Sequence, residues 1–306
     1  MTLRDISGVF SREFIVGYFA PAFFIAIVVA YSVDWAPQHF KNTGGSSRLL
    51  LVGGLALLVA LVLNGLRHPL TSIYSGTRPL DVIGLGSASI EFGEHHSRPR
   101  RLIAGRAKRR LQIQFDTLGH VIAKGGTDAR EASKIRDVRL GSDREEIAPT
   151  RLGAASGAVS GYAKTRWNVD LWYAWPRIEP LIDESARALQ RDAETDQAFF
   201  LNSALLTLAA GAALTIDECF GDTTWWRLIA IPVGAILLHW ILYRFAVQAA
   251  ERAATCARAC IDLHYPELLS RLGATGDIVT ASDELDDFWV QAKRPSWLKT
   301  VPKRNP

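Results

Sequence analysis

The sequence lacks the patterns that mark most enzymes and disulfide-bonded proteins. Only three of its 306 residues are cysteines, and no two of them form a CxxC pair. No glycine-rich phosphate loop follows a strand pattern, and Ser156 in GAASGAVSG does not fit the nucleophile-elbow pattern of hydrolases. We also find no internal repeat. These absences argue against a disulfide framework and a catalytic constellation, so we expect a protein that is not an enzyme.

Charge is also missing from long stretches of the chain. The run FIVGYFAPAFFIAIVVAYSV has no charged residue in twenty positions, and three more predominantly apolar runs follow. The four runs cover residues 14–33, 49–66, 198–216 and 225–243. An α-helix needs about 20 apolar residues to cross a bilayer, and these runs show no polar face. We therefore predict an all-α integral membrane protein with four transmembrane helices.

A secretory signal peptide is the alternative explanation of the first run. Its flank, MTLRDISGVFSREF, balances two arginines against two acids, and no small-x-small cleavage site follows the run. These features favour an uncleaved span.

Lysine and arginine are distributed unevenly between the segments that connect the runs. Residues 67–197 hold 21 of them and residues 244–306 hold nine, whereas the short connection DECFGDTT holds none. Because positive residues stay on the cytoplasmic side, we predict that both termini and the large middle segment are cytoplasmic. The chain then divides into a first pair of spans (1–66), a basic, mainly helical cytoplasmic domain (67–197), a second pair (198–243) and a cytoplasmic helix and tail (244–306).

Helical spacing dominates the expected cytoplasmic domain. Leu111, Phe115, Leu118 and Ile122 recur every three or four residues, which gives one helix an apolar face. Thr150 stands where a helix cap would precede the next helical segment.

Two longer helices are expected on either side of the second pair of spans. After Pro180 the pattern runs unbroken into the third span, and residues 243–264 contain neither glycine nor proline. Both helices should therefore extend from the membrane into the cytoplasm. The segment DVIGLGSASIEFG (81–93) alternates loosely and fits a loop or a short strand.

The stretch SRPRRLIAGRAKRR carries seven positive residues and no acid. They are Arg98, Arg100, Arg101, Arg106, Lys108, Arg109 and Arg110. Such a cluster is typical of a surface that binds a nucleotide, an oligonucleotide or anionic lipid. It is more often typical of a segment that is retained in the cytoplasm, and less often of one that pairs with nearby acids. No aromatic residue is interleaved with the run, as a platform for stacking single-stranded nucleic acid would require.

Two clusters have metal-ligand or acid–base residue types. Cys256, Cys260 and His264 fall on one face of a helix, and EFGEHH (91–96) places two carboxylates beside two imidazoles. One helix rarely supplies more than two zinc ligands, and the second cluster has no matching partner motif. We therefore expect helix packing for the first and a surface loop for the second, with no metal and no cofactor.

Polar residues are few within the apolar runs. Asn64 and Asn202 lie near the cytoplasmic ends of their spans, where snorkelling to the interface or hydrogen bonding between helices is the simplest explanation. His239 lies deeper. His239 is thus our candidate for a pore-lining or helix-contact residue. Pro21 and Pro232 are candidates to kink their spans, and the small residues of 207–214 suit close helix packing within or between subunits.

Three patches resemble a family of bacterial four-span membrane proteins. They are LNGLRHPLTSIYSG after the second run, PTRLG followed by DLWYAWPRI, and CIDLHYPELLSRLG after the fourth run. The resemblance implies the same four-span topology, in a bacterial inner membrane. It supplies no catalytic residues.

Function is expected to follow from assembly. Four spans suit one subunit of a homo-oligomer whose spans line a pore, with Asp217, Glu218 and Asp222 at its outer mouth favouring cations. An anionic ligand on the face Arg98–Arg110, or a soluble partner, would gate it. A bacterial stress or phage-defence effector would be one setting, by analogy. The alternative is a non-conducting membrane scaffold that recruits a cytoplasmic protein.

Overall fold

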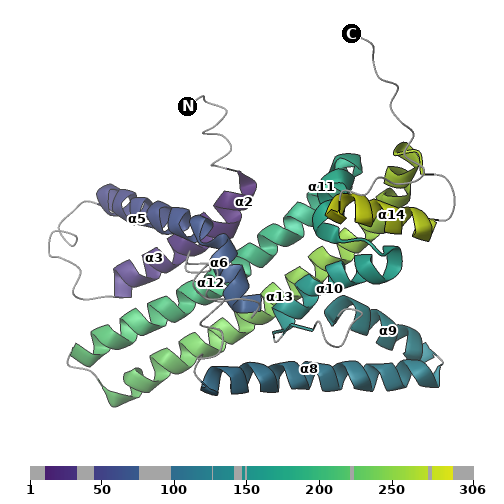
Figure 1. Cartoon of the computed structure of the whole chain (residues 1–306). Helices are drawn as coiled ribbons and strands as arrows, with labels where there is room; N and C mark the ends of the chain where they lie inside the picture. The colour runs from purple at the N-terminus through teal and green to yellow at the C-terminus, as the bar shows by residue number, and fades with distance from the viewer. Residues whose placement is uncertain are drawn as a thin grey trace, which may run out of the picture. The chain divides into compact units, whose positions relative to one another are not determined.

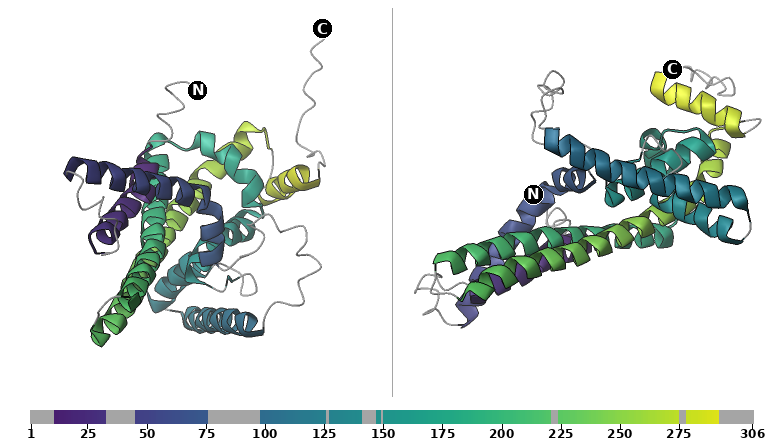
Figure 2. Two further views of the ribbon diagram at one scale, coloured as in Figure 1. Left: turned by 90° about the vertical axis from the view of Figure 1, so that its left-hand side faces the viewer. Right: turned by 90° about the horizontal axis from the view of Figure 1, so that it is seen from below.

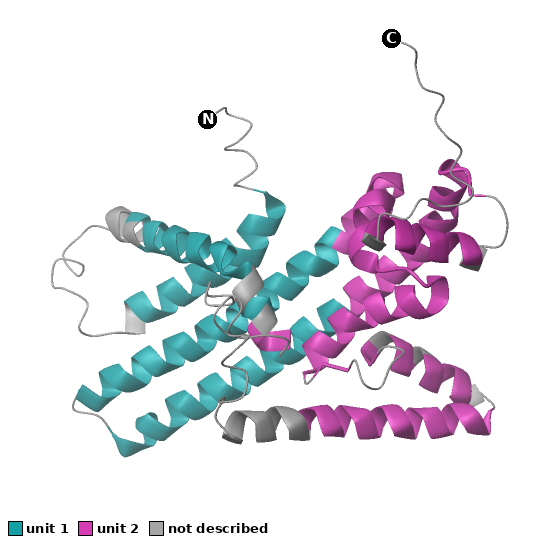
Figure 3. Ribbon diagram, in the orientation of Figure 1, with its two compact units in different colours: residues 1–71, 191–250 teal, residues 72–190, 251–306 magenta. Residues whose placement is uncertain are grey.

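The computed structural model describes residues 11–32, 45–75, 98–125, 127–140, 147–148, 150–220, 224–274 and 278–291 (Figure 1). Every secondary-structure element assigned in these residues is a helix, which confirms the all-α class. They group into two compact units (Figure 3): unit 1 is residues 1–71 and 191–250, and unit 2 is residues 72–190 and 251–306. The predictions for residues 81–96 lie outside the described residues.

Unit 1 contains all or part of seven helical elements of the described chain, including the candidate membrane spans. In chain order they are α2 (Arg12–Phe14), the π-helical turn η1 (Ile15–Phe19), α3 (Ala20–Ser32), α5 (Gly45–Gly65), α6 (Arg67–Ser75), α12 (Glu184–Phe220) and α13 (Trp225–Arg271), of which the last three continue into unit 2. Residues Arg12–Ala30, α12 and α13 are each long and apolar enough to cross a membrane. A shorter apolar stretch, Val52–Gly65, lies in α5. The chain thus has candidate membrane-spanning helices, as its uncharged runs predict.

A proline shapes the first candidate span. Pro21 has no N–H, so the carbonyl of Gly17 four residues earlier cannot accept the ordinary helical hydrogen bond from it. The side-chain amide of Asn202 in α12 donates to that carbonyl oxygen at 2.8 Å, and Asn202 is buried. A Cβ atom on Gly17 would lie 3.4 Å from the Cβ of Ala198, at van der Waals contact. A side chain from another helix therefore bonds the carbonyl group that Pro21 leaves without its helical donor, so the structure selects interhelical hydrogen bonding from the two alternatives for Asn202.

The core of unit 1 is formed by small and aromatic residues. Phe14, Tyr18 and Ala22 of the first span pack with Ala56 and Ala60 of α5, and residues of α12 cover this cluster. The alanines are fully buried, which lets the helix backbones approach closely. The first span, α5 and α12 thus share one apolar cluster.

The unit 1 segments of α12 and α13 lie side by side (Figure 2). A Cβ atom on Gly211 of α12 would collide with the Cβ of Ala235, so only glycine fits at this crossing. The ring Nδ1 of His239 in α13 lies 2.9 Å from the carbonyl oxygen of Ala204. The prediction of a close-packing face at 207–214 is confirmed, and His239 makes a helix contact.

Replacing Asn202 by leucine should lower the stability of the purified protein in detergent by about 1–2 kcal/mol, because the buried Gly17 carbonyl loses its donor. Chemical unfolding followed by circular dichroism measures this. Asn64→Leu is the matched control, since Asn64 is exposed on α5 and should change stability little. Equal effects of the two substitutions would contradict the role of Asn202.

Unit 2 contains the remaining helices and the ends of α6, α12 and α13. These remaining elements are α8 (Arg98–Lys124), α9 (Thr127–Arg139), α10 (Arg151–Trp167), α11 (Leu171–Ile178), the 3-10 turn η3 (Glu179–Leu181) and α14 (Ile278–Gln291). Val169, Ile178, Ile261, Tyr265 and Leu285 are buried in one core. Two of the patches that carry the family resemblance, DLWYAWPRI and CIDLHYPELLSRLG, thus supply core residues, and packing explains their apolar residue types.

Helix α10 begins as its sequence predicts. Thr150 caps it, and its hydroxyl oxygen accepts a hydrogen bond from the backbone N–H of Gly153 at 3.1 Å. Gly153 is required for a second reason, because a Cβ atom there would collide with the carbonyl oxygen of Ser75 and lie 2.8 Å from the Cβ of Ala148. Gly157, one turn later, has nothing within 4 Å of the same position.

These two glycines should respond oppositely to alanine. Gly153→Ala is expected to destabilise the protein by about 1–3 kcal/mol, because the α6 backbone must move away. Gly157→Ala should stabilise it by up to about 1 kcal/mol, because alanine favours the helix and meets no obstacle. Unfolding midpoints of the two variants test the prediction, and a stabilising effect of Gly153→Ala would refute the close approach.

Candidate functional site

A cavity with both apolar and charged walls lies within unit 2. Its volume is about 310 Å3. It is lined by residues of α8, α9, α10 and α13, namely Leu111, Gln114, Thr117, Leu118, Ile135, Arg139, Leu140, Arg151 and Glu251. Ligand pockets of proteins begin at about this size and combine apolar walls with a few polar groups. The pocket is therefore our candidate functional site.

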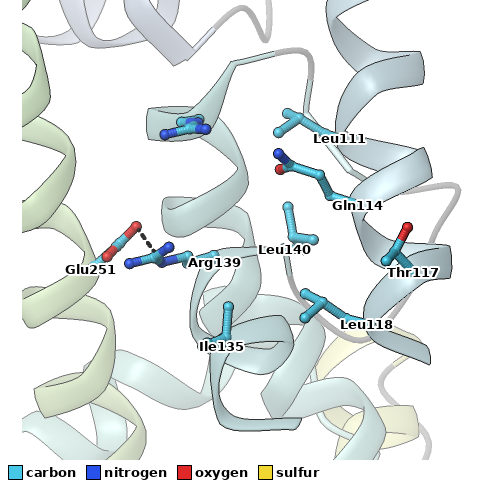
Figure 4. Close-up of a pocket in the computed structure, with 9 residues that line it drawn as sticks. Leu111, Gln114, Thr117, Leu118, Ile135, Arg139, Leu140 and Glu251 are labelled. Carbon is cyan, nitrogen blue, oxygen red and sulfur yellow. Dashed lines mark ion pairs between the residues drawn. The ribbon is translucent and has the colours of Figure 1, made fainter. Parts of the chain in front are cut away.

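The apolar wall of the pocket comes from the hairpin of α8 and α9. Leu111 and Leu140 are buried in a small cluster with Ile147 and Ala154, and Leu118 packs against it. Gly125 lies between the two helices with a φ of 74°, a left-handed conformation that glycine adopts without strain. Figure 4 shows Leu111 and Leu118 extending from α8 towards Leu140. The predicted apolar face of α8 thus forms both the hairpin contact and one side of the pocket.

Charge is concentrated at the opposite side of the pocket. The Arg139 guanidinium lies 3.1 Å from a Glu251 carboxylate oxygen, as the dashed line in Figure 4 marks. The Glu251 side chain is 19% exposed and that of Arg139 is 56% exposed. Arg151, at the first position of α10, is exposed and adds a second guanidinium. Two positive groups therefore meet one negative group at this wall.

A buried arginine anchors the helices that form this wall. Arg258 of α13 is 8% exposed and donates to the carbonyl oxygens of Asp137 in α9 and Ala158 in α10, the latter at 2.9 Å. Its guanidinium also lies 5.2 Å from the centre of the Tyr162 ring. Burial lowers the pKa of this guanidinium. Because Asp137 lies between two pocket residues of α9, Arg258 fixes this part of α9 against α10 and α13.

Asp262, one turn after Arg258, continues this network. The Tyr162 hydroxyl donates to its carboxylate at 2.7 Å, and the indole N–H of Trp167 donates at 3.1 Å. Burial, together with the hydrogen bond to Asp262, raises the pKa of Tyr162 to about 12. Trp167 also packs against Tyr265, with ring centres 5.5 Å apart. The network is structural in form, because its polar groups bond one another and close the contact of α10 with α13.

The predicted basic run is placed only in part. It lies in α8, but the side chains of Arg98, Arg100, Arg101 and Arg106 are outside the described residues. Lys108 is half-buried, and the remaining two members, Arg109 and Arg110, are exposed immediately before the pocket residue Leu111. Its anion-binding role stays a prediction.

The predicted pore residues lie in unit 1. Glu218 is 3.6 Å from Arg227 across the connection of α12 and α13, and Asp217 is half-buried. Asp222 lies outside the described residues. Phe220, Trp225 and Trp226 near them are exposed, which suits an interfacial aromatic belt. A pore role for Asp217, Glu218 and His239 stays a prediction.

The cluster of Cys256, Cys260 and His264 is part of the helix packing of unit 2. Cys260 is buried in the core of unit 2, and burial raises the pKa of its thiol. The His264 ring Nδ1 lies 3.5 Å from a carboxylate oxygen of Glu267, which Arg271 also contacts. Within the residues that the structure describes, no group of three or more His, Cys, Asp or Glu side chains could hold a metal ion.

Sequence reasoning missed Arg139, Arg151, Glu251 and Arg258. One signal was available for Glu251, because it is the first acid after the 28 residues from Thr223 to Ala250, on a helix that leaves the fourth apolar run. The others are ordinary members of a chain with 35 lysines and arginines. They differ from the other arginines only because the fold brings α8, α9, α10 and α13 together around them.

Comparisons with known proteins do not assign the chain to a family. No protein-family model, curated protein or solved structure matches the chain. The resemblance to bacterial four-span membrane proteins therefore stays a prediction.

The Tyr162–Asp262 bond should appear in the pH dependence of stability. An unfolded tyrosine loses its proton near pH 10, whereas folded Tyr162 keeps it to about pH 12, so stability should fall as pH rises through this interval. Tyr162→Phe should make that fall smaller, and Asp262→Asn should shift the titration of Tyr162 towards lower pH. Unfolding curves and the absorbance of tyrosinate at successive pH values measure both. Superimposable curves for wild type and Tyr162→Phe would contradict the assignment.

Proposed function

We propose that the chain is a four-span protein of a bacterial inner membrane, with unit 2 and both termini in the cytoplasm. The 21 residues of α5 give a length of roughly 30 Å, enough for a fourth span beside the other three candidates. The excess of lysine and arginine in residues 67–197 and 244–306 supports this orientation.

We further propose that several copies assemble in the membrane. None of the apolar window of α13 is buried within one subunit. Its exposed residues include Ile229, Val233, Ile236, Leu237, Trp240 and Ile241. Lipid can cover such a surface, and so can the same surface of a second copy. Four spans are few for a monomeric transporter but sufficient for one subunit of a ring.

The proposed activity is ion conduction through the centre of this assembly, controlled by unit 2. The observation that carries the proposal is the continuity of α13: one helix from Trp225 to Arg271 forms the fourth candidate span and one wall of the cytoplasmic pocket. A change at Glu251 therefore acts on the same helix that crosses the membrane. Asn202 and His239 are engaged in helix contacts, so the cation preference is assigned to the outer acids Asp217, Glu218 and Asp222.

Planar-bilayer recording on the purified protein tests conduction. We expect unitary currents that favour cations. Glu218→Gln should lower the cation-to-anion permeability ratio, and Arg227→Gln, its paired control, should raise it, because the two substitutions remove opposite charges from one ion pair. Absence of currents under all conditions, from protein that is folded and inserted, would refute the pore.

A non-conducting scaffold is the second candidate, and two side chains of unit 2 favour it. Trp172 of α11 is 82% exposed and Leu263 of α13 is 72% exposed. Exposed tryptophan is enriched at protein interfaces. For a scaffold, planar-bilayer recording should show no currents. Trp172→Ala should then abolish capture of a soluble protein without changing the fold.

A further inference from the structure

We infer that the pocket of unit 2 binds a small organic anion with an apolar body, in competition with the carboxylate of Glu251. The inference deepens the proposed function, because it names the ligand class and the site of control, and its regulatory part rests on that function. The binding itself depends only on the pocket.

The walls of the pocket favour a ligand with an apolar body. Leu111, Leu118, Ile135 and Leu140 offer apolar surface, and Gln114 and Thr117 of α8 add hydrogen-bonding groups to it. Apolar surface that leaves water on binding contributes about 25 cal/mol per Å2. An inorganic ion gains nothing from such walls, whereas an alkyl chain or a planar ring does.

The arginines set the charge of the ligand. Arg151 lines the pocket and makes no ion pair with any other residue that the structure describes. Arg139 lines it too, and its partner is Glu251. Arginine binds carboxylate and phosphate groups through two parallel hydrogen bonds. A carboxylate or phosphate at this wall would thus have one available guanidinium and a second that it must share with Glu251.

The carboxylate of Glu251 competes with the ligand for Arg139. It is the pocket residue contributed by α13, and its side chain is mostly buried beside Arg139. An anion that contacts Arg139 repels this carboxylate and weakens its ion pair. Ligand binding and the conformation of α13 at Glu251 are therefore linked, since each changes the free energy of the other.

Isothermal titration of the full-length protein in nanodiscs tests the ligand class with paired probes. Adenosine monophosphate is compared with adenosine, hexanoate with hexanol, and both with inorganic phosphate. We expect at least one organic anion to bind roughly tenfold or more tightly than its neutral counterpart and than inorganic phosphate, because the charged hydrogen bonds and the apolar contacts add. The two pairs distinguish a nucleotide from an aliphatic carboxylate.

Charge variants locate the site. Arg151→Gln should weaken binding of that anion by roughly tenfold, and Glu251→Gln should strengthen it by freeing Arg139. Thr117→Trp, at an exposed position on the rim, should block the pocket without disturbing the core. Arg130→Gln, exposed on α9 and outside the pocket, is the matched control and should leave the affinity unchanged.

Three results would overturn the inference. They are the absence of binding by either anion, an unchanged affinity in both Arg151→Gln and Thr117→Trp, and a loss of affinity in Arg109→Gln as large as that in Arg151→Gln. The last would assign binding to the basic run instead. If the anion binds but no currents are recorded in planar bilayers, the pocket is supported and the pore is refuted. If currents are recorded but no anion binds, the pore is supported and the ligand site is refuted.

Discussion

A backbone N–H or C=O group in apolar surroundings finds no water, and on the proposed membrane placement this constraint accounts for much of unit 1. It explains why the uncharged runs form helices, in which each backbone group is bonded within its own segment. Pro21 removes one donor from the first span, and the chain meets that loss with Asn202. A single polar side chain thus both completes a helix and joins two of them, which is why small residues such as Ala198 surround the contact.

Arg258 joins helices in unit 2 in a similar way. Its guanidinium donates to carbonyl oxygens of two helices, while its buried Nε has no hydrogen-bond partner among the described residues. Both carbonyls belong to helices that line or adjoin the pocket. The buried charge therefore fixes a site whose own arginines remain at the surface. Arg139, the exposed member of the pair with the mostly buried Glu251, lies on a helix that Arg258 holds in place.

Local patterns in the sequence predict what depends on neighbouring residues along the chain. The helical class, the apolar face of α8, the cap at Thr150 and the packing face near Gly211 all follow from spacing or residue type. The π-helical turn η1 and the pocket do not. No spacing in the sequence marks the turn, although its own hydrogen bond is local, from the Ala20 N–H to the Ile15 carbonyl oxygen. The pocket depends on four helices that tertiary packing brings together.

The boundaries of the two units have a practical consequence for biochemistry. The chain crosses between units at residues 71/72, 190/191 and 250/251, and each crossing falls inside a helix, in α6, α12 and α13 respectively. Proteases cleave exposed, irregular segments, and none of these three points is one. Limited digestion should therefore not release unit 2 as a soluble fragment. A water-soluble version would have to replace residues 191–250 by a designed turn and begin after residue 71.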